Sequence, residues 1–208
     1  MNFEILSGFI LATGALAISP GPDNIYVLTQ SIVNGKKYGL ATVAGLISGC
    51  LVHTTLLAFG VSAIIKQSDV LFLIIKLFGA LYLFYLAFQV FKSEVDLELK
   101  DGSIPKKSLW QLFKQGFIMN VLNPKVAIFF LAFFPGFLFS DSINTVVQFY
   151  TLGLLFMLVS FIIFSLIAIM AGYISDYITK NSKLGLYLKW LQILVFVSIA
   201  VYILLSDK

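Results

Sequence analysis

The 208-residue chain has little charge, one cysteine, one histidine and no arginine. Charged residues make up 12% of the sequence, which is roughly half of what a soluble domain carries. Because Cys50 is alone, it cannot form an internal disulfide, a CxxC redox pair or a thiolate metal site. These shortages argue against a soluble domain, a thiol–disulfide electron carrier and a cysteine-rich metal centre.

Long apolar runs dominate what remains. Hydrophobic residues account for 60% of the chain, and the mean hydropathy is +0.99. Several runs exceed the roughly 18 to 20 residues that a helix needs to cross a bilayer. We predict an all-α, polytopic membrane protein with a single domain over residues 1–208. The six predicted spans cover about residues 3–32, 38–65, 70–91, 112–139, 145–174 and 186–205, with a charged loop at about 92–107.

The lysines predict how these spans are oriented. Cytoplasmic loops collect lysine and arginine. Ten of the fourteen lysines lie near the loops after spans one, three and five: Lys36, Lys37, Lys92, Lys100, Lys106, Lys107, Lys114, Lys180, Lys183 and Lys189. The opposite side has only Lys66, Lys76 and Lys208. We therefore expect those three loops inside and both termini outside. Because the lysines flank spans, the net charge of +4 does not indicate a nucleic-acid partner.

Two spans are interrupted by residues that break helices. Residues 19–24 read Ser-Pro-Gly-Pro-Asp-Asn, and residues 120–125 read Asn-Val-Leu-Asn-Pro-Lys. In lipid, an interrupted helix leaves backbone groups unpaired unless the break is buried in protein or lines a watery cavity. Paired breaks in two halves of a chain indicate a transport site. The candidate substrate-binding residues are Pro20, Gly21, Pro22, Asp23, Asn24, Asn120, Asn123, Pro124 and Lys125.

Weak internal similarity relates the two halves. The segments that open spans three and six, at residues 76–81 and 189–194, are 113 positions apart. Pro-Gly pairs at 20 and 135 are 115 apart, and Gly-Phe-Ile at 8 and 116 are 108 apart. The near-common offset predicts a duplicated three-helix unit, about residues 1–92 and 108–208. Because three spans is an odd number, the two units would be inverted in the membrane, with spans one and four broken.

Asp23 and Lys125 are the charged residues at the breaks, and each has two interpretations. Asp23 either caps the half-helix after the first break or faces the cavity, where it could bind an ammonium group or a coupling proton. Lys125 either extends to the inner headgroups or pairs with Asp23 when the site is empty and with a substrate carboxylate when it is occupied. Pro124 frees a carbonyl about one turn earlier, and Asn120 and Asn123 could satisfy the freed backbone.

Span two contributes His53 and a G-x-x-x-G pattern. His53 is too isolated for a metal site, so it is either a packing residue or part of proton coupling. Gly45 and Gly49 permit close approach of another helix, and we expect this contact to lie within the chain. The phenylalanines that follow the second break, Phe129, Phe130, Phe133, Phe134 and Phe137, are expected mainly in the core.

At these motifs the chain resembles the LysE/RhtB superfamily of amino-acid exporters. Residues 19–24, 34–40, Gly45 and 51–53 match the first signature, and residues 115–117, Asn120, 122–125 and 129–133 match the second. The resemblance spans essentially the whole chain. It implies a six-helix inner-membrane exporter of amino acids or close derivatives, driven by the proton gradient. At position 136 this chain has a glycine, whereas members of the family often have a polar residue there, commonly glutamine.

The expected function is therefore efflux of a small zwitterion, with no enzyme activity, catalytic residue or cofactor. Half-helix N-termini and Lys125 would hold the carboxylate, while Asp23 and freed carbonyls would hold the ammonium. Asp23 and His53 are the candidates for proton coupling. Expected partners are the amino acid, protons, membrane lipid and a second copy in a C2 homodimer. The alternative is a divalent-cation exporter of the same superfamily, although Asp23, His53 and Cys50 are its only candidate ligands.

Overall fold

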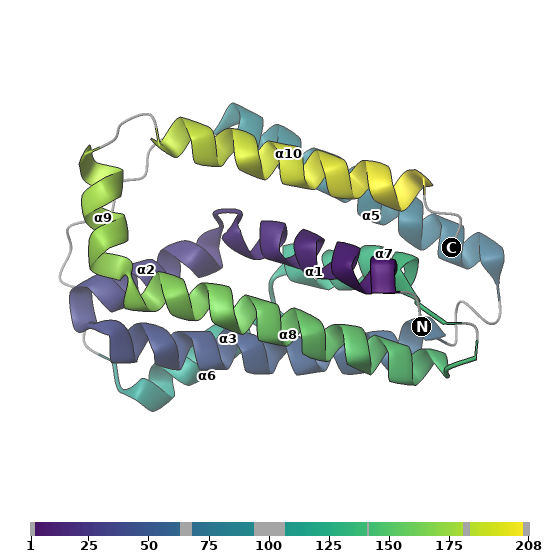
Figure 1. Ribbon diagram of the computed structural model, residues 1–208, viewed down its shortest axis with the longest axis horizontal. Coiled ribbons are helices and arrows are strands. Elements are labelled where there is room, and N and C mark those ends of the chain that lie inside the picture. Colours follow the sequence, from purple (N-terminus) through teal and green to yellow (C-terminus); the bar gives the residue numbers. More distant parts are fainter. Residues whose placement is uncertain (1–2, 63–67, 94–106, 141, 181–183, 206–208) are drawn as a thin grey trace.

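The computed structural model describes residues 3–62, 68–93, 107–140, 142–180 and 184–205, and this part of the chain is helical without strands (Figure 1). The helices are α1 Phe3–Ile18, α2 Pro22–Asn34, α3 Lys36–Leu56, α5 Asp69–Lys92, α6 Leu109–Val121, α7 Pro124–Phe133, α8 Thr145–Ile169, α9 Ala171–Lys180 and α10 Leu184–Leu205. A π-helical turn, η1 Leu57–Val61, continues α3, and a 3₁₀ turn, η2 Phe134–Phe137, continues α7.

The membrane-spanning helices fall into two kinds. Four continuous segments are long and apolar enough to cross a bilayer: Lys36–Val61, Val70–Lys92, Thr145–Ile169 and Gly185–Leu205. Two further spans are pairs of helices joined at a bend. The bend between α1 and α2 is 59°, and the bend between α6 and the segment formed by α7 and η2 is 51°. Counting each pair as one span gives six within the described residues. The prediction of an all-α polytopic membrane protein with breaks in spans one and four is confirmed.

The fifth span is shorter than predicted. We expected it to continue to residue 174, but α8 ends at Ile169, and α9 begins at Ala171. In Figure 1 α9 turns sharply away from the axis of α8. Met170 leaves the helical conformation with φ of −90° and ψ of 11°, and Gly172 follows one residue into α9. Most of the predicted charged loop at 92–107 lies outside the described residues.

The second half of the chain runs in the opposite direction to the first. In Figure 1 the bent pair α1–α2 runs away from the end that holds both termini, whereas α6–α7 runs toward it. The same reversal relates α3 to α8 and α5 to α10. The order of a bent pair followed by two long helices is thus repeated with inverted direction. This arrangement agrees with the predicted inverted repeats, and gene duplication remains a prediction.

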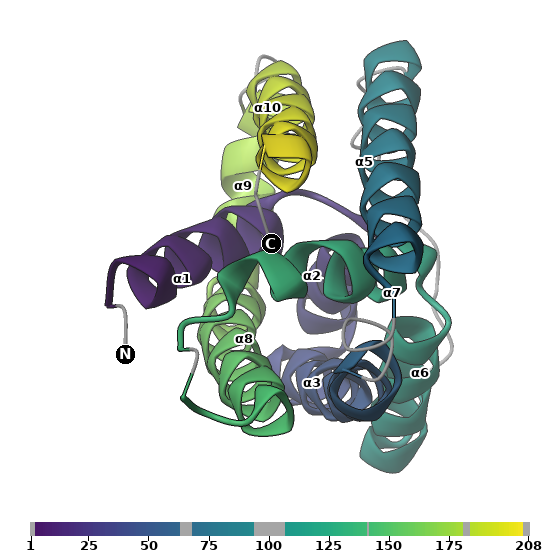
Figure 2. The same cartoon turned by 90° about the vertical axis from the view of Figure 1, so that its right-hand side faces the viewer.

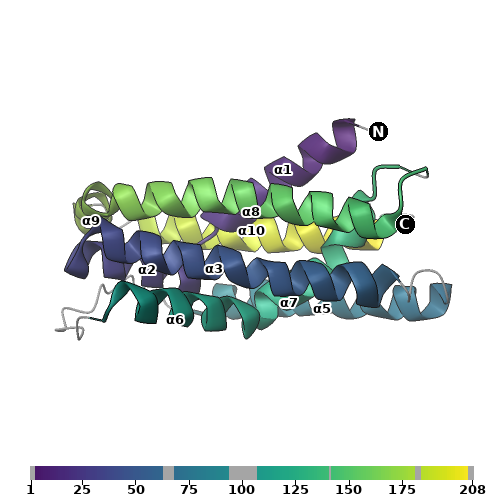
Figure 3. The ribbon, with the colours of Figure 1, turned by 90° about the horizontal axis from the view of Figure 1, so that it is seen from below.

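The helices form three layers (Figures 1 and 2). α5 and α10 pack together as one outer layer. α3, α6 and α8 form the opposite outer layer, seen nearest the viewer in Figure 3. The half-helices α1, α2 and α7 lie between the two. The two chain breaks therefore lie between the outer layers, where neighbouring helices can shield freed backbone, although Leu122 of the second break is 74% exposed.

Glycines allow α3 and α6 to touch backbone to backbone. A Cβ on Gly45 would lie 2.0 Å from the Phe113 carbonyl oxygen, and one on Gly116 would lie 2.4 Å from the Thr42 carbonyl oxygen. Neither contact leaves room for any side chain. The G-x-x-x-G pattern therefore serves helix packing within the chain, as predicted.

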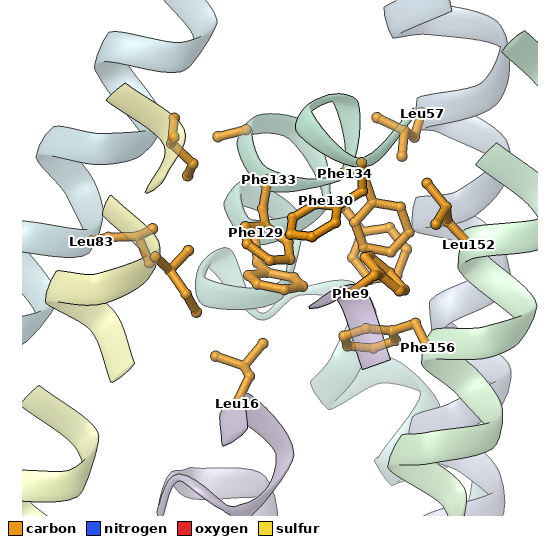
Figure 4. Close-up of a cluster of buried hydrophobic side chains, with 14 of the residues drawn as sticks. Phe9, Leu16, Leu57, Leu83, Phe129, Phe130, Phe133, Phe134, Leu152 and Phe156 are labelled. Carbon is orange, nitrogen blue, oxygen red and sulfur yellow. The ribbon is translucent and has the colours of Figure 1, made fainter. Parts of the chain in front are cut away.

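Aromatic packing closes the region beside α7. Phe129, Phe130, Phe133 and Phe134 are nearly or fully buried, and Phe9 of α1 lies against the last two (Figure 4). Phe156 of α8 also contacts Phe129 and Phe130. The prediction that these phenylalanines form core is confirmed. We call this group, together with Phe137, the phenylalanine cluster.

Candidate functional site

The first break is held together by an asparagine. Pro20 and Pro22 supply no N–H, and Gly21 is the N-cap of α2 without any side-chain cap. Asn24 Nδ2 donates to the Ala17 carbonyl at 2.8 Å, which satisfies one acceptor that the break frees. Asp23 lies one position inside α2 and does not cap it. The capping interpretation of Asp23 is therefore wrong, because Gly21 takes that position.

The second break is capped by Asn123, which also reaches the first. Asn123 Oδ1 accepts from the Lys125 backbone N–H at 3.0 Å, and Pro124 occupies the first turn of α7. Asn123 Nδ2 donates to Asp23 Oδ2 at 3.0 Å. One side chain thus stabilises the start of α7 and binds the carboxylate of α2. The two breaks meet although Asp23 and Asn123 are 100 residues apart.

His53 binds the carbonyl that Pro124 frees, as a second partner beside a backbone N–H of the break. In a regular helix the Asn120 carbonyl would accept from residue 124, which is a proline without an N–H. His53 Nε2 lies 3.1 Å from this oxygen and is buried beside the Phe130 ring. Because a carbonyl only accepts, Nε2 carries the hydrogen. We expected Asn120 and Asn123 to satisfy the freed backbone; the Asn123 backbone N–H donates to the Asn120 carbonyl at 3.1 Å, and His53 of α3 adds a second bond to the same oxygen.

Lys125 lies among the helices, with its ammonium group beside an aromatic ring. Its Nζ is 4.8 Å from the centre of the Phe196 ring in α10. A Cβ on Gly21 would lie 3.5 Å from the same Nζ. Among the described residues, no acceptor forms a hydrogen bond or an ion pair with this ammonium group. The expected direct contact with Asp23 is thus absent in this conformation, because Asn123 takes the carboxylate and Nζ points toward α10.

A small cavity of about 40 Å³ joins the two breaks. The polar residues that line it from the two breaks are Asp23, Asn24, Asn120, Asn123 and Lys125. The remaining wall is mainly apolar and comes from α1, α3, α7 and α8. Asp23 and Lys125 therefore face one enclosed space from different half-helices, and their opposite charges attract across it. Pro124 does not line this space, and its part in the site is to end the preceding helix.

A larger cavity of about 630 Å³ lies on the other side of the first break. It separates α2 from α5 and α10, and Tyr26, Thr29 and Gln192 line it. It extends to Ser93 and Lys189, where Lys189 Nζ donates to the Ser93 carbonyl at 2.8 Å. Gly21 and Pro22 line both cavities. We call the larger space the vestibule; sequence reasoning gave no sign of it.

The candidate metal ligands do not gather. Cys50 and Asp23 line the small cavity, but His53 is bound to the Asn120 carbonyl outside it. Within the described ranges, no group of three or more His, Cys, Asp or Glu side chains could hold a metal ion.

Comparison with known proteins places the chain among the translocators. Residues 14–207 match the model of the LysE type translocator family, so the match includes both breaks. The chain belongs to this family. Family membership indicates a transporter rather than an enzyme, in agreement with the paired breaks.

Proteins that are similar in sequence to this LysE-type translocator are named as efflux proteins. The leucine efflux proteins of Salmonella choleraesuis (strain SC-B67) and Salmonella typhimurium are each 28% identical over 186 residues, covering 88% of both chains. The homoserine/homoserine lactone efflux protein of Salmonella typhi is 30% identical over 178 residues, covering 86% of this chain and 85% of the relative. No solved structure matches the chain.

Proposed function

We propose that this translocator exports amino acids or close derivatives across the bacterial inner membrane. The observation that carries the proposal is the polar cavity, where a carboxylate and an unpaired ammonium face one enclosed space from two broken helices. The efflux relatives, which cover most of the chain, support the same substrate class.

The helix ends at the breaks suit both charges of a zwitterion. α2 and α7 begin at the cavity, and helix N-termini are partly positive. α1 and α6 end beside it, with partly negative carbonyl ends. We infer that Lys125 and the N-terminus of α7 bind the substrate carboxylate. Asp23 and the carbonyl end of α1 bind its ammonium.

The cavity must open before it can bind substrate. A space of about 40 Å³ accommodates a water molecule or two but no amino acid. The vestibule is large enough for one, and the wall formed by Gly21 and Pro22 borders both spaces. We infer that substrate enters the vestibule and reaches Asp23 and Lys125 when this wall moves. The bond between Asn123 and Asp23 would then give way to bonds with the substrate.

Proton coupling and orientation complete the proposal. Protonation of Asp23 would remove the charge that holds the substrate ammonium, and this change would couple release to the proton gradient. His53 supports the site by holding the second break, which leaves Asp23 as the coupling residue. With the lysine-rich loops inside, the vestibule opens to the cytoplasm and both termini lie outside.

Counterflow in proteoliposomes tests the proposed function. Purified protein is reconstituted with an internal amino-acid panel, and uptake of labelled amino acid is followed with and without an imposed pH gradient. We expect substrate-specific counterflow that responds to the gradient. Asp23→Asn and Lys125→Met should abolish it, whereas Lys114→Met, at an exposed lysine of α6, should retain it. Wild-type flux in both site variants would contradict the proposed site.

The same proteoliposomes distinguish amino-acid export from divalent-cation export. Loading with Mn²⁺ or Zn²⁺ in place of amino acids tests divalent-cation export. Metal flux without amino-acid flux, in protein shown to be folded, would replace the proposed function with the cation exporter.

A further inference from the structure

One polar side chain of the small cavity belongs to neither break. Ser160 lies in α8, is 2% exposed, and lines the same cavity as Asp23 and Lys125. Its Oγ is buried and has no hydrogen-bond partner. A buried hydroxyl without a partner is costly, so such a group indicates a missing donor or acceptor.

Ser160 differs from most hydroxyls on the helices of this protein. Thr151 donates to the Val147 carbonyl, and Thr54 donates to the Cys50 carbonyl, each four residues earlier. This local bond is the usual solution for a serine or threonine inside a helix. Ser160 has the same opportunity on α8 but does not form the bond. Its hydroxyl is left available at the cavity wall.

The surroundings of Ser160 suit the side chain of a substrate. Phe156 and Phe164 line the cavity one turn before and one turn after it, on the same face of α8. This face is apolar except for the one hydroxyl. The charged groups lie on the other half-helices, so a zwitterion held at Asp23 and Lys125 has its side chain left to meet α8.

We propose that Ser160 is a specificity-determining residue that selects substrates with a hydroxyl on the side chain. This inference rests on the proposed amino-acid export. The phenylalanines exclude charged side chains, and Ser160 forms a hydrogen bond with the substrate hydroxyl. A site built to bind a hydroxyl discriminates against an analogue that lacks it, because its own polar group is then left unpaired.

Isosteric substrate pairs test the proposal. In the wild-type protein, each compound is tested as an inhibitor of labelled amino-acid counterflow. The inhibition by threonine is compared with that by valine, and the inhibition by homoserine with that by 2-aminopentanoic acid. In each pair a hydroxyl replaces a methyl group at nearly constant shape. We expect the hydroxylated member to compete about tenfold better, a ratio equal to one hydrogen bond of about 1.4 kcal/mol. Ser160→Ala should bring the ratio close to one while transport continues.

Two matched variants show whether the effect belongs to this hydroxyl. Ser165 is also on α8 with a buried, unpartnered hydroxyl, but it does not line the cavity. Ser165→Ala should therefore keep the wild-type ratio. Ser160→Thr retains the hydroxyl and should keep a preference that Ser160→Ala loses.

The possible results distinguish a failure of the proposed role of Ser160 from a failure of the proposed amino-acid export. Wild-type protein that moves amino acids with equal competition in both pairs overturns the role of Ser160 and leaves the proposed function standing. An unchanged ratio in Ser160→Ala, or an equal loss in Ser165→Ala, also overturns it. If folded wild-type protein moves no amino acid, the proposed function itself fails.

Discussion

The two half-helices that follow the breaks have unequal surroundings. α7 packs against α5 and α10, and its phenylalanines fill the space between the layers. α2 packs against α3, α8 and α9, but the vestibule lies between it and the α5–α10 pair. Inverted chain direction makes α2 and α7 counterparts. Their different packing leaves the vestibule on one side of the site and a smaller cavity of about 330 Å³, lined by Phe133, Phe137 and Tyr202, on the side of the termini.

The different packing of α2 and α7 indicates which conformation of the transport cycle this structure represents. We infer that the phenylalanine cluster separates the small cavity from the side of the termini, and that the vestibule gives access to it from the lysine-rich side. Transporters with inverted repeats alternate by exchanging such arrangements between the two repeats. We expect the outward-open state to bring α2 against α10 and to separate α7 from its neighbours. The predictions below test this exchange.

Fixing α2 to α10 should have the largest effect. Thr29 and Leu188 line the vestibule from these two helices. In the double variant Thr29→Cys with Leu188→Cys, a bifunctional thiol reagent that bridges the vestibule should abolish counterflow, because it prevents the exchange. The two single-cysteine variants treated with the same reagent serve as controls. Full transport by a verified cross-linked protein would show that α2 and α10 do not need to move.

Removing a side chain from the phenylalanine cluster should lower the stability of the folded protein. Phe134 is fully buried and contacts Phe9, Phe129, Phe130 and Phe156. Phe134→Ala should lower the free energy of unfolding by about 3 kcal/mol, the low end for such a truncation, because lipid also solvates apolar groups. Ile25→Ala, at an exposed position of α2, should change it by less than about 1 kcal/mol. Thermal unfolding in detergent measures both, and equal losses would contradict the proposed difference in packing.

Thiol labelling should report the same difference at each membrane side. Cys50 is buried, so the wild-type protein should react little with a membrane-impermeant maleimide. Thr29→Cys should react at least about tenfold faster, because its side chain lines the open vestibule. Ser142→Cys lies in the connection beside the termini. In inside-out vesicles Thr29→Cys should react and Ser142→Cys should not. The reverse pattern would invert the predicted topology.

The smallest expected effect is at the end of α7. Tyr202 Oη donates to the Gly136 carbonyl at 2.9 Å, which ties η2 to α10. Tyr202→Phe keeps the ring against Phe137 and removes only this bond, so it should cost about 1 kcal/mol of stability. We also expect a modest rise in the outward-open fraction, measured as slower labelling of Thr29→Cys, whose side chain lines the vestibule. A stability loss comparable to that of Phe134→Ala would show that the ring and not the bond is affected.

Particular residues show how far the sequence could be interpreted. The apolar runs and the two breaks predicted six spans, because backbone in lipid must be paired within a helix or shielded by protein. The five phenylalanines between residues 129 and 137 were expected in the core and are there. The length of the fifth span was wrong, because nothing in its hydropathy marks the turn at Met170.

The contacts between distant residues required the structure. His53 was an isolated histidine in sequence, yet it binds the carbonyl that Pro124 frees in another helix. Asn123 was expected to satisfy the second break, but its bond to Asp23 depends on how α2 and α7 meet. Ser160 had no local signal at all, since a serine in a helix usually bonds to its own backbone.

The sequence by itself determined that this chain lies in a membrane, where its helices break, and which family it resembles. Those features follow from local chemistry: hydropathy, proline without an N–H, and a short signature around each break. Tertiary structure alone decided which half-helix is packed and which is open, and which side chains share the cavity. These depend on the packing of the three layers, because each side chain finds its partner on a different helix.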